Sequence, residues 1–347
     1  MQSGKGVRKK KGNAQVRRKM PTIIAIILVV LLGIFSGPVS SLIGKQNTEE
    51  LIEQLESYVY ENIAETNFIE DENSLEQPTT VGTDVEGSLQ MYVIDVGQAD
   101  AILFVQDDQV MLVDAGTSGG GDEVVRHLKE LGIEEIDILI GTHPHSDHMG
   151  GISKVLKNFT VRKFYFPRRT DVTTTYYINI LEFVVENNIP CGSAEAGDVI
   201  PFGEGQIKFV TSTGPKQEKD LNNCSIVIRV TFGEIDFFLG GDIEKEIEEE
   251  ILASGIEIES EVYKASHHGS HTSNTREIME AIDPECIIIS CGKDNTHNHP
   301  HKSVIGLFEE LGIPVYRTDE SGTITITTDG KTVVADKEPG SYISGEE

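Results

Sequence analysis

Short apolar runs alternate with amphipathic segments from residue 89 to residue 335. Runs of four to eight residues bounded by turn residues are typical of buried strands, and apolar residues recurring every three or four positions are typical of helices. The runs predict strands at 89–96, 101–105, 110–114, 136–140, 163–166, 206–211, 225–232, 235–239, 261–264, 286–290, 322–328 and 332–335. The amphipathic segments predict helices at 122–131, 152–158, 177–187, 244–253, 274–281 and 303–311.

The order of these elements predicts the fold class. Two strand-rich halves, each with its own helices, bury their apolar faces when the two sheets pack together and the helices cover the outside. We therefore predict an α/β fold with four layers, an αββα sandwich, for residues 89–336. Residues 337–347 are expected to form a solvated tail.

The beginning of the chain has a different pattern. Residues 1–20 carry eight Lys or Arg and no acidic residue, and residues 21–44 carry no charge. Such an apolar stretch suits a helix that crosses a bilayer, and the positive-inside tendency then places residues 1–20 in the cytoplasm and the globular part outside. We predict a single-pass protein of the cell membrane with an extracytoplasmic domain. Cleavage of the same stretch as a signal peptide, which would release a secreted protein, stays open.

Acidic residues dominate the rest of the chain. Residues 45–88 predict an acidic stalk with one short amphipathic helix, whose apolar stripe more often packs locally than binds a partner. The net charge of the whole chain is −28, although the first 20 residues are basic. An acidic body repels extended polyanions unless metal ions or a basic strip offset its field. This argues against a long DNA footprint but not against the cleavage of a phosphodiester.

Nine of the ten histidines fall into three clusters, each near the end of an apolar run. The clusters are His143/His145/His148, His267/His268/His271 and His297/His299/His301. Because open α/β sheets place their sites at the ends of strands, the three clusters indicate convergence on one site. Alternate residues of an extended loop point the same way, so His143 and His145 can bind one cation while Asp147 and His148 face a second. The four cysteines form no CxxC pair, and we expect them to be buried small residues.

Asp242 is the carboxylate expected to join these histidines. It follows the apolar strand at 235–239, where a buried carboxylate serves to bind a cation or to cap the helix that begins near Glu244. We favour the metal ligand, because the Gly-Asp pair stands among the histidine clusters.

Seven motifs occur in a fixed order along the chain. They are IDVGQADA at 94–101, VDAG at 113–116, THPHSDHMGG at 142–151, NNCSIVIR at 222–229, FLGGD at 238–242, KASHHGSHTS at 264–273 and HNHPH at 297–301. Together they resemble the metallo-β-lactamase superfamily, and more narrowly the hydrolase domain of ComEC-type DNA-internalisation competence proteins. The resemblance implies a phosphodiesterase or nuclease that uses a hydroxide bridged by two divalent ions, zinc or manganese.

The resemblance also implies which residues hold the two ions. The implied ligands are His143 and His145 for the first ion, Asp147, His148 and His268 for the second, and Asp242 as the bridge. We choose His268 over His267 because it directly precedes Gly269, although the alternative stays open.

The sequence departs from the wider superfamily at the first ion. No histidine lies between His148 and Asp242, where many members place a third imidazole. That ion is therefore either more open or completed by water, Asn223 or Cys224. A true β-lactamase, which normally has the third imidazole, is less favoured.

Other polar residues of the motifs receive supporting roles. Beside the metal ligand Asp147, the candidates for catalysis are His267 and His299, which can protonate the leaving oxygen or contact phosphate. Residues expected to orient the ligands and their loops are Asp95, Gln98, Asp100, Asp114, Asn223 and Ser225. Residues expected to contact substrate are Ser270, Thr272 and His301, with helix capping an equal alternative for the first two.

The substrate class predicted from these features is a phosphodiester in nucleic acid, a nucleotide or the cell envelope. Hydrolysis of lactones, β-lactams or envelope phosphoesters is the alternative activity. A non-catalytic surface binding protein on the same fold is the alternative class.

Overall fold

The computed structural model describes residues 85–346 except residues 168, 170 and 215–218. The basic tail at 1–20, the anchor or signal segment at 21–44 and nearly all of the stalk at 45–88 therefore lie outside the described residues. Among the helices that the structure does describe, none has the length and apolarity needed for a membrane crossing.

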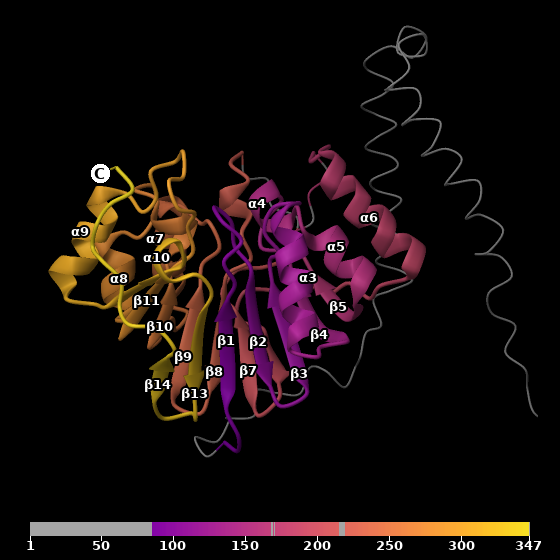
Figure 1. Ribbon diagram of the computed structural model, residues 1–347, viewed down its shortest axis with the longest axis horizontal. Coiled ribbons are helices and arrows are strands. Elements are labelled where there is room, and N and C mark those ends of the chain that lie inside the picture. The colour runs from indigo at the N-terminus through magenta and orange to yellow at the C-terminus, as the bar shows by residue number, and fades with distance from the viewer. Residues whose placement is uncertain (1–84, 168, 170, 215–218, 347) are drawn as a thin grey trace, which may run out of the picture. The chain divides into compact units, whose positions relative to one another are not determined.

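Two seven-stranded sheets form the centre of the described domain (Figure 1). The first sheet contains β1 (Leu89–Val93), β2 (Ile102–Gln106), β3 (Gln109–Val113), β4 (Glu135–Ile140), β5 (Thr160–Tyr165), β13 (Ile324–Thr328) and β14 (Val333–Ala335), in the order β14-β13-β1-β2-β3-β4-β5. The second contains β6 (Val199–Phe202), β7 (Gly205–Phe209), β8 (Ile228–Phe232), β9 (Ile235–Leu239), β10 (Val262–Lys264), β11 (Cys286–Ile289) and β12 (Val315–Arg317), in the order β12-β11-β10-β9-β8-β7-β6.

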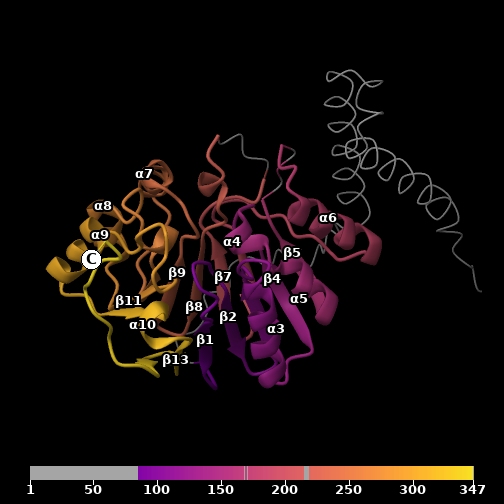
Figure 2. The ribbon, with the colours of Figure 1, turned by 45° about the horizontal axis from the view of Figure 1, so that its top comes forward.

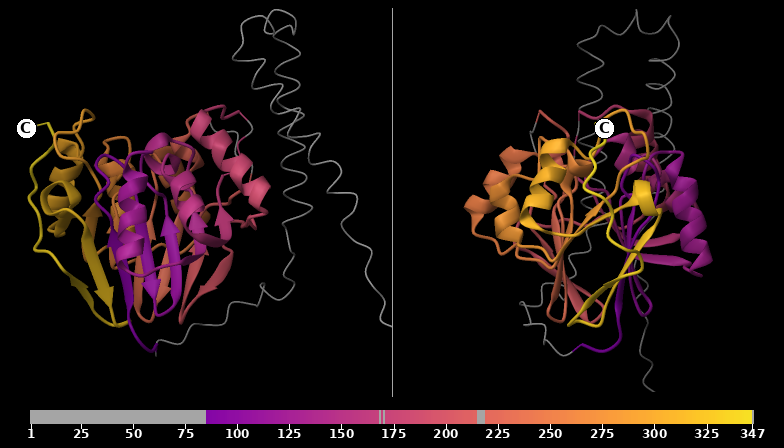
Figure 3. Two further views of the ribbon diagram at one scale, coloured as in Figure 1. Left: turned by 45° about the vertical axis from the view of Figure 1, so that its right-hand side comes forward. Right: turned by 60° about the vertical axis from the view of Figure 1, so that its left-hand side comes forward.

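Helices cover the outer face of each sheet (Figure 3). Beside the first sheet lie α3 (Gly120–Glu130), α5 (Ile152–Asn158) and α6 (Thr175–Asn187). Beside the second lie α7 (Lys245–Ser254), α8 (Arg276–Ile282) and α9 (Lys302–Leu311). Shorter helical turns are α4 (Ser146–Met149), α10 (Thr318–Ser321), η1 (Asn222–Cys224) and η2 (Ser266–Gly269). The predicted α/β fold with two packed sheets between helices is confirmed.

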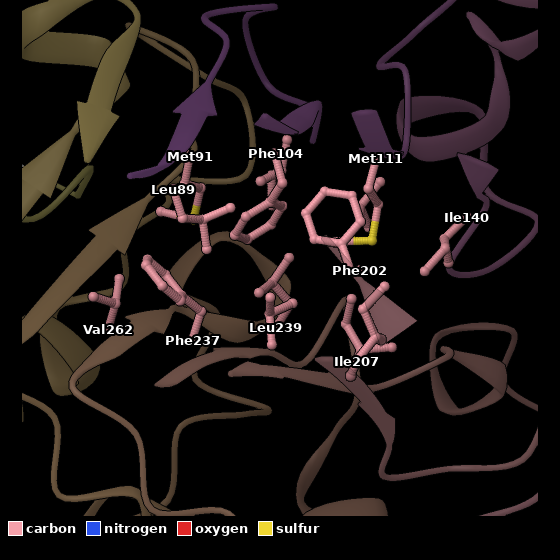
Figure 4. Close-up of a cluster of buried hydrophobic side chains, with 14 of the residues drawn as sticks. Leu89, Met91, Phe104, Met111, Ile140, Phe202, Ile207, Phe237, Leu239 and Val262 are labelled. Atoms are coloured by element: carbon pink, nitrogen blue, oxygen red, sulfur yellow. The ribbon is translucent and has the colours of Figure 1, made fainter. Parts of the chain in front are cut away.

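Apolar side chains from both sheets fill the space between them (Figure 4). The rings of Phe104 on β2 and Phe237 on β9 meet edge to face, with centroids 5.5 Å apart. The next residue, Phe238, points to the opposite face of its sheet and packs with Ile247 of α7 and Ile278 of α8. Successive residues of a strand face opposite sides, so one apolar run supplies both the core between the sheets and the core under the helices.

Two strands were not predicted. β6 contains Pro201 and buries only Phe202 among its four residues, because it lies at the edge of its sheet. β12 has three residues and also lies at an edge. Proline breaks the strand pattern of β6, and β12 is too short to predict, whereas the other strands and the long helices lie within a few residues of their predicted bounds.

The C-terminal tail differs from the solvated segment that was predicted. The Arg317 guanidinium donates to the carbonyl oxygens of Ser341 and Ile343. Farther along, the Gly345 amide donates to the Pro300 carbonyl oxygen over 2.9 Å. The tail is thus held against β12 and against the loop that carries the third histidine cluster, although much of it is exposed.

Replacing Phe237 with alanine tests the core between the sheets. We expect Phe237→Ala to lower the free energy of unfolding by about 3–5 kcal/mol, because a buried ring is removed and the two sheets cannot close the cavity. Urea denaturation of the purified protein measures the change. Leu131→Ala is the control, since Leu131 is 42% exposed and its loss should cost about 0.5 kcal/mol or less. A loss below about 1 kcal/mol for Phe237→Ala would contradict a tightly packed core.

Candidate metal centre

The candidate ligands lie where strands of both sheets end. The His143 and His145 loop and α4 follow β4, Asp242 follows β9, and η2 follows β10. β4 pairs in parallel with β3, and β10 pairs in parallel with β9 and β11, so the carboxyl ends of each set share one edge. Figure 2 shows α4 at this end of the strands. The structure therefore brings the first two histidine clusters together, as the sequence predicts.

One carboxylate oxygen stands at the centre of the site. Four imidazole Nε2 atoms surround Oδ2 of Asp242, those of His148 at 3.1 Å, His268 at 3.7 Å, His267 at 3.8 Å and His143 at 3.9 Å. Helix α7 begins at Lys245 with Glu244 at its N-cap position, so Asp242 is not the helix cap. Its side chain is 2% exposed and faces the histidines instead.

Asp147, His148, Asp242 and His268 form the tightest group of possible metal ligands. One ligand atom from each of the four lies within 4.8 Å of all the others. Nε2 of His148, Nε2 of His268 and Oδ1 of Asp242 are buried and have no hydrogen-bond partner among the described residues. Buried polar atoms are normally paired, and imidazole and carboxylate donors suit zinc or manganese. The residues therefore fit a divalent metal ion, and they are the set that the resemblance implies for the second ion.

The outer nitrogens of the two buried histidines are held in place. Nδ1 of His148 lies 2.7 Å from Oδ2 of Asp114, whose other oxygen accepts the Thr142 amide hydrogen over 2.8 Å. Nδ1 of His268 lies 2.8 Å from the carbonyl oxygen of Ser290 and 3.3 Å from Oδ1 of Asp100. Such partners fix the ring orientation and leave Nε2 free to bind metal. Asp114 and Asp100 therefore lie next to ligand histidines, and their orienting role stays a prediction.

The loop that carries His267 and His268 has an unusual backbone. Their φ values are +50° and +54°, in the left-handed region that residues other than glycine rarely adopt. The His267 amide donates to the Gly241 carbonyl oxygen over 3.0 Å, and the Ser270 amide donates to the His267 carbonyl oxygen over 2.8 Å. Strain of this kind persists only where the surroundings determine the conformation, and it often marks functional sites.

His143 and His145 lie next to this group of four possible ligands, with the His143 ring 4.1 Å from that of His148. Nε2 of His143 is 3.0 Å from Nδ1 of His145, and Ser225 Oγ is 3.3 Å from Nδ1 of His143. The Ser225 hydroxyl also accepts the Asp242 amide hydrogen over 3.1 Å. Ser225 thus connects the two ligand loops, in keeping with its predicted supporting role.

The side chains proposed to complete the first metal ion have other partners. Oδ1 of Asn223 accepts the Glu244 amide hydrogen over 2.9 Å, so Asn223 fixes the loop after Asp242. Sγ of Cys224 accepts a hydrogen bond from the Arg169 guanidinium over 3.0 Å. Because its side-chain oxygen is already bonded to Glu244, these contacts do not favour Asn223 as a direct ligand.

Asp95 and Gln98 differ in what they contact. Asp95 is exposed, and its carboxylate accepts the Gly97 amide hydrogen within the same turn. The prediction that Asp95 orients a ligand is therefore corrected, because its side chain closes its own turn. Nε2 of Gln98 lies 3.1 Å from Nδ1 of His299, and Oε1 of Gln98 accepts the Gly292 amide hydrogen. Gln98 thus holds the third histidine cluster.

The third cluster lies beside the second. The ring of His299 stacks at 6.0 Å from that of His268 and lies 5.5 Å from that of His267. Nδ1 of His301 accepts the His271 amide hydrogen over 3.1 Å. The Thr272 hydroxyl lies 3.2 Å from Nδ1 of His267 and 3.1 Å from the Ser270 hydroxyl. Contact of Ser270, Thr272 and His301 with substrate stays a prediction.

Lys264 received no role from the sequence. Its Nζ lies 2.9 Å from Oδ2 of Asp100, and both side chains are almost completely buried. Lys264 stands at the start of the motif KASHHGSHTS, directly after the apolar residues of β10. The sequence feature that indicates a buried partner for Lys264 is its place within an apolar strand, because lysine is almost never fully buried without a partner.

Opposite effects of burial and charge set the protonation of the ligands. Burial disfavours charge on His148, but Asp242 and Asp114 outweigh it and raise the pKa well above its usual value. Burial likewise opposes charge on His268, yet Asp242 and Asp100 raise its pKa to about 10. Burial together with the charge of His148 keeps the pKa of His143 well below its usual value. Without metal, protons on His148 and His268 therefore balance the surrounding carboxylates.

The fold and the ligand set define a metal-dependent hydrolase architecture, and comparison with known proteins identifies it. The profile of the metallo-beta-lactamase superfamily matches residues 94–292, more than half of the chain. The protein belongs to this superfamily.

Its relatives include competence proteins of the ComEC type, as the motifs predict. ComE operon protein 3 of Bacillus subtilis is 31% identical over 258 residues, which cover 69% of this chain and 33% of that protein. Competence protein ComA of Neisseria gonorrhoeae is 27% identical over 255 residues, covering 69% and 32%. Exodeoxyribonuclease YycJ of Bacillus anthracis is 31% identical over 124 residues, covering 35% and 44%. The chain thus spans about a third of the length of the two competence relatives.

Metal binding should release protons. At pH 7, His148 and His268 are protonated in the metal-free protein because their pKa values are raised, and a metal ion at Nε2 must displace those protons. We expect roughly one to two protons per ion at this site, and an affinity that falls as the pH decreases. Calorimetric titration with zinc in two buffers of different ionisation enthalpy measures the release.

His127→Ala is the control for this titration, because His127 lies on α3 outside the clusters and its variant should release as many protons as the wild type. Zinc binding with the same heat in both buffers would contradict the charge balance described above.

Proposed function

We propose that this protein is a metal-dependent phosphodiesterase that cleaves nucleic acid, a nucleotide or an envelope phosphodiester. The observation that carries the proposal is the group of Asp147, His148, Asp242 and His268, with Nε2 of His143 3.9 Å from Oδ2 of Asp242. When bound, two divalent ions lower the pKa of a water molecule and neutralise charge on phosphoryl oxygens. The residues would hold one ion with Asp147, His148 and His268 and the other with His143 and His145, with Asp242 between them.

The protein's own groups orient this site and exclude water from part of it. The distances of Asp114 and Asp100 to the outer nitrogens of His148 and His268, 2.7 and 3.3 Å, support a role for both carboxylates in holding these imidazoles. Asp147 is one-third exposed, so the substrate would approach from its side of the site. Its carboxylate would bind metal and fix the approach of the reacting phosphate rather than act as the base.

The environment of His299 favours one of its two predicted roles. Burial and the neighbouring His268 lower the pKa of His299 to about 3. At neutral pH, His299 is therefore a neutral imidazole, a hydrogen-bond donor to a phosphoryl oxygen rather than a ready source of protons. Burial also lowers the pKa of His267, but His267 is 21% exposed and its Nδ1 lies 3.6 Å from Glu244, so we keep it as the candidate for protonation of the leaving oxygen.

The comparisons support nucleic acid as the substrate. One relative is named an exodeoxyribonuclease, and others are competence or recombination proteins. The acidic chain favours short or small phosphodiesters over long duplex DNA, because the net charge of −28 repels polyanions. Lactone or β-lactam hydrolysis is the competing activity.

Loss of the Asp242 carboxylate should strongly reduce this activity. We expect Asp242→Ala to lower kcat/KM for bis-p-nitrophenyl phosphate and for single-stranded DNA by at least about 100-fold, because even partners behind a metal ligand cost 10–100-fold in activity or affinity. Metal content is measured on the same samples. Asp122→Ala is the control, since the Asp122 side chain is 77% exposed on α3.

Three results would contradict the proposal. Turnover confined to a panel of lactones would favour the competing hydrolase. Phosphodiesterase activity equal in Asp242→Ala and wild type would show that the activity resides elsewhere. A wild-type protein with no bound metal and no turnover would favour a binding protein on the same fold.

We also propose that the domain lies outside the cytoplasmic membrane. The support comes from residues 1–44 of the sequence, a basic segment followed by an uncharged apolar one. A C-terminal epitope tag on the full chain should be digested by protease added to cells whose outer layers have been removed, while a cytoplasmic marker stays intact. A tag that is protected until the cells are lysed would contradict this placement.

A further inference from the structure

A buried ion pair joins the two sheets directly behind the candidate metal ligands. Lys264 lies at the end of β10 in the second sheet, and Asp100 lies just before β2 in the first. Their side chains are 1% and 2% exposed, and Nζ is 2.9 Å from Oδ2. Nζ also donates to the Ala265 carbonyl oxygen over 2.9 Å. Both charges are therefore removed from water and paired with each other.

Stability alone gives little reason for such a pair. Removing two charges from water is costly, and apolar residues of similar volume often replace a buried ion pair without loss of stability. Elsewhere between the sheets the chain uses apolar contacts such as Phe104 against Phe237. The position of the ion pair is therefore more informative than its contribution to folding.

Asp100 contacts two candidate ligand residues. Its Oδ1 lies 3.3 Å from Nδ1 of His268, beside the Ser290 carbonyl oxygen that is hydrogen-bonded to the same nitrogen at 2.8 Å. Its backbone amide donates to the carbonyl oxygen of Asp147 over 3.2 Å. Its own carbonyl oxygen accepts the Gly116 amide hydrogen over 2.8 Å. While Lys264 holds Oδ2, Oδ1 of Asp100 faces the outer nitrogen of His268 and adds a negative charge beside it.

We propose that Lys264 is a positioning residue for the metal centre and acts through Asp100. This inference rests on the metal centre proposed above. Lys264 keeps Asp100 turned toward Nδ1 of His268, which directs Nε2 of His268 toward Asp147 and Asp242, at 3.6 and 3.7 Å. Held in this way, Asp100 supports the ligand His268 and does not itself bind the metal ion.

A double-mutant cycle on the full chain tests the proposal. The variants are Lys264→Met, Asp100→Asn and the double variant, and the measurements are zinc affinity by chelator competition and the Tm of the metal-free protein. Because Lys264 acts through Asp100, each single variant should bind zinc about 10- to 100-fold more weakly, and the double variant no more weakly than Asp100→Asn. The double variant should also recover most of the Tm that Lys264→Met loses, about 10 °C, since it leaves no unpaired buried carboxylate.

A second ion pair serves as the matched control. Arg229 and Asp236 form a mostly buried pair between β8 and β9, with side chains 9% and 13% exposed. Their contacts include Glu257, Glu259, Glu261 and Thr231, none of which is a candidate ligand. Arg229→Met/Asp236→Asn should therefore change Tm without changing zinc affinity.

Each other outcome overturns a distinct statement. Wild-type zinc affinity in Lys264→Met and in the double variant would show that the ion pair has only a structural role. Losses of affinity that multiply in the double variant would show that Lys264 does not act through Asp100. If Lys264→Met does not fold, the comparison of Asp100→Asn with the double variant decides this point. A wild-type chain that binds neither zinc nor manganese would overturn the metal centre itself.

Discussion

Asp242 places a carboxylate between the ends of two sheets, where a negative charge is stable only if cations or donors surround it. Its Oδ2 has four imidazole nitrogens within 3.9 Å. Those imidazoles need partners on their outer nitrogens in turn, which Asp114, Ser290 and Asp100 supply. The polar centre is thus a set of mutually dependent contacts, and its geometry follows from the need to compensate each buried charge.

The sheets supply the rigid frame for these contacts. Parallel pairing of β4 with β3, and of β10 with β9 and β11, brings loops from distant parts of the sequence to one edge. Apolar residues such as Phe104 and Phe237 then fix the distance between the sheets. The loops carry the candidate ligands, and the strands fix the positions of those loops. This division is common where catalytic groups lie at strand ends.

Much of this arrangement was predictable because it depends on local patterns. The apolar run at 235–239 predicts β9, and the spacing of His143, His145 and His148 predicts that they share a site. What was not predictable depends on backbone angles and long-range partners. Asp95 and Asp100 lie in the same motif, yet one closes its own turn and the other contacts His268. The partner of Lys264 is 164 residues away, so no local pattern reveals it.

That separation has a consequence for how the protein reaches its native state. Loop closure over such a span is entropically costly, and neither Lys264 nor Asp100 gains from leaving water until the other arrives. The packing of the two sheets against each other and the assembly of the candidate metal site are therefore one cooperative event. A newly synthesised chain would therefore bring the candidate metal ligands together only when folding is complete.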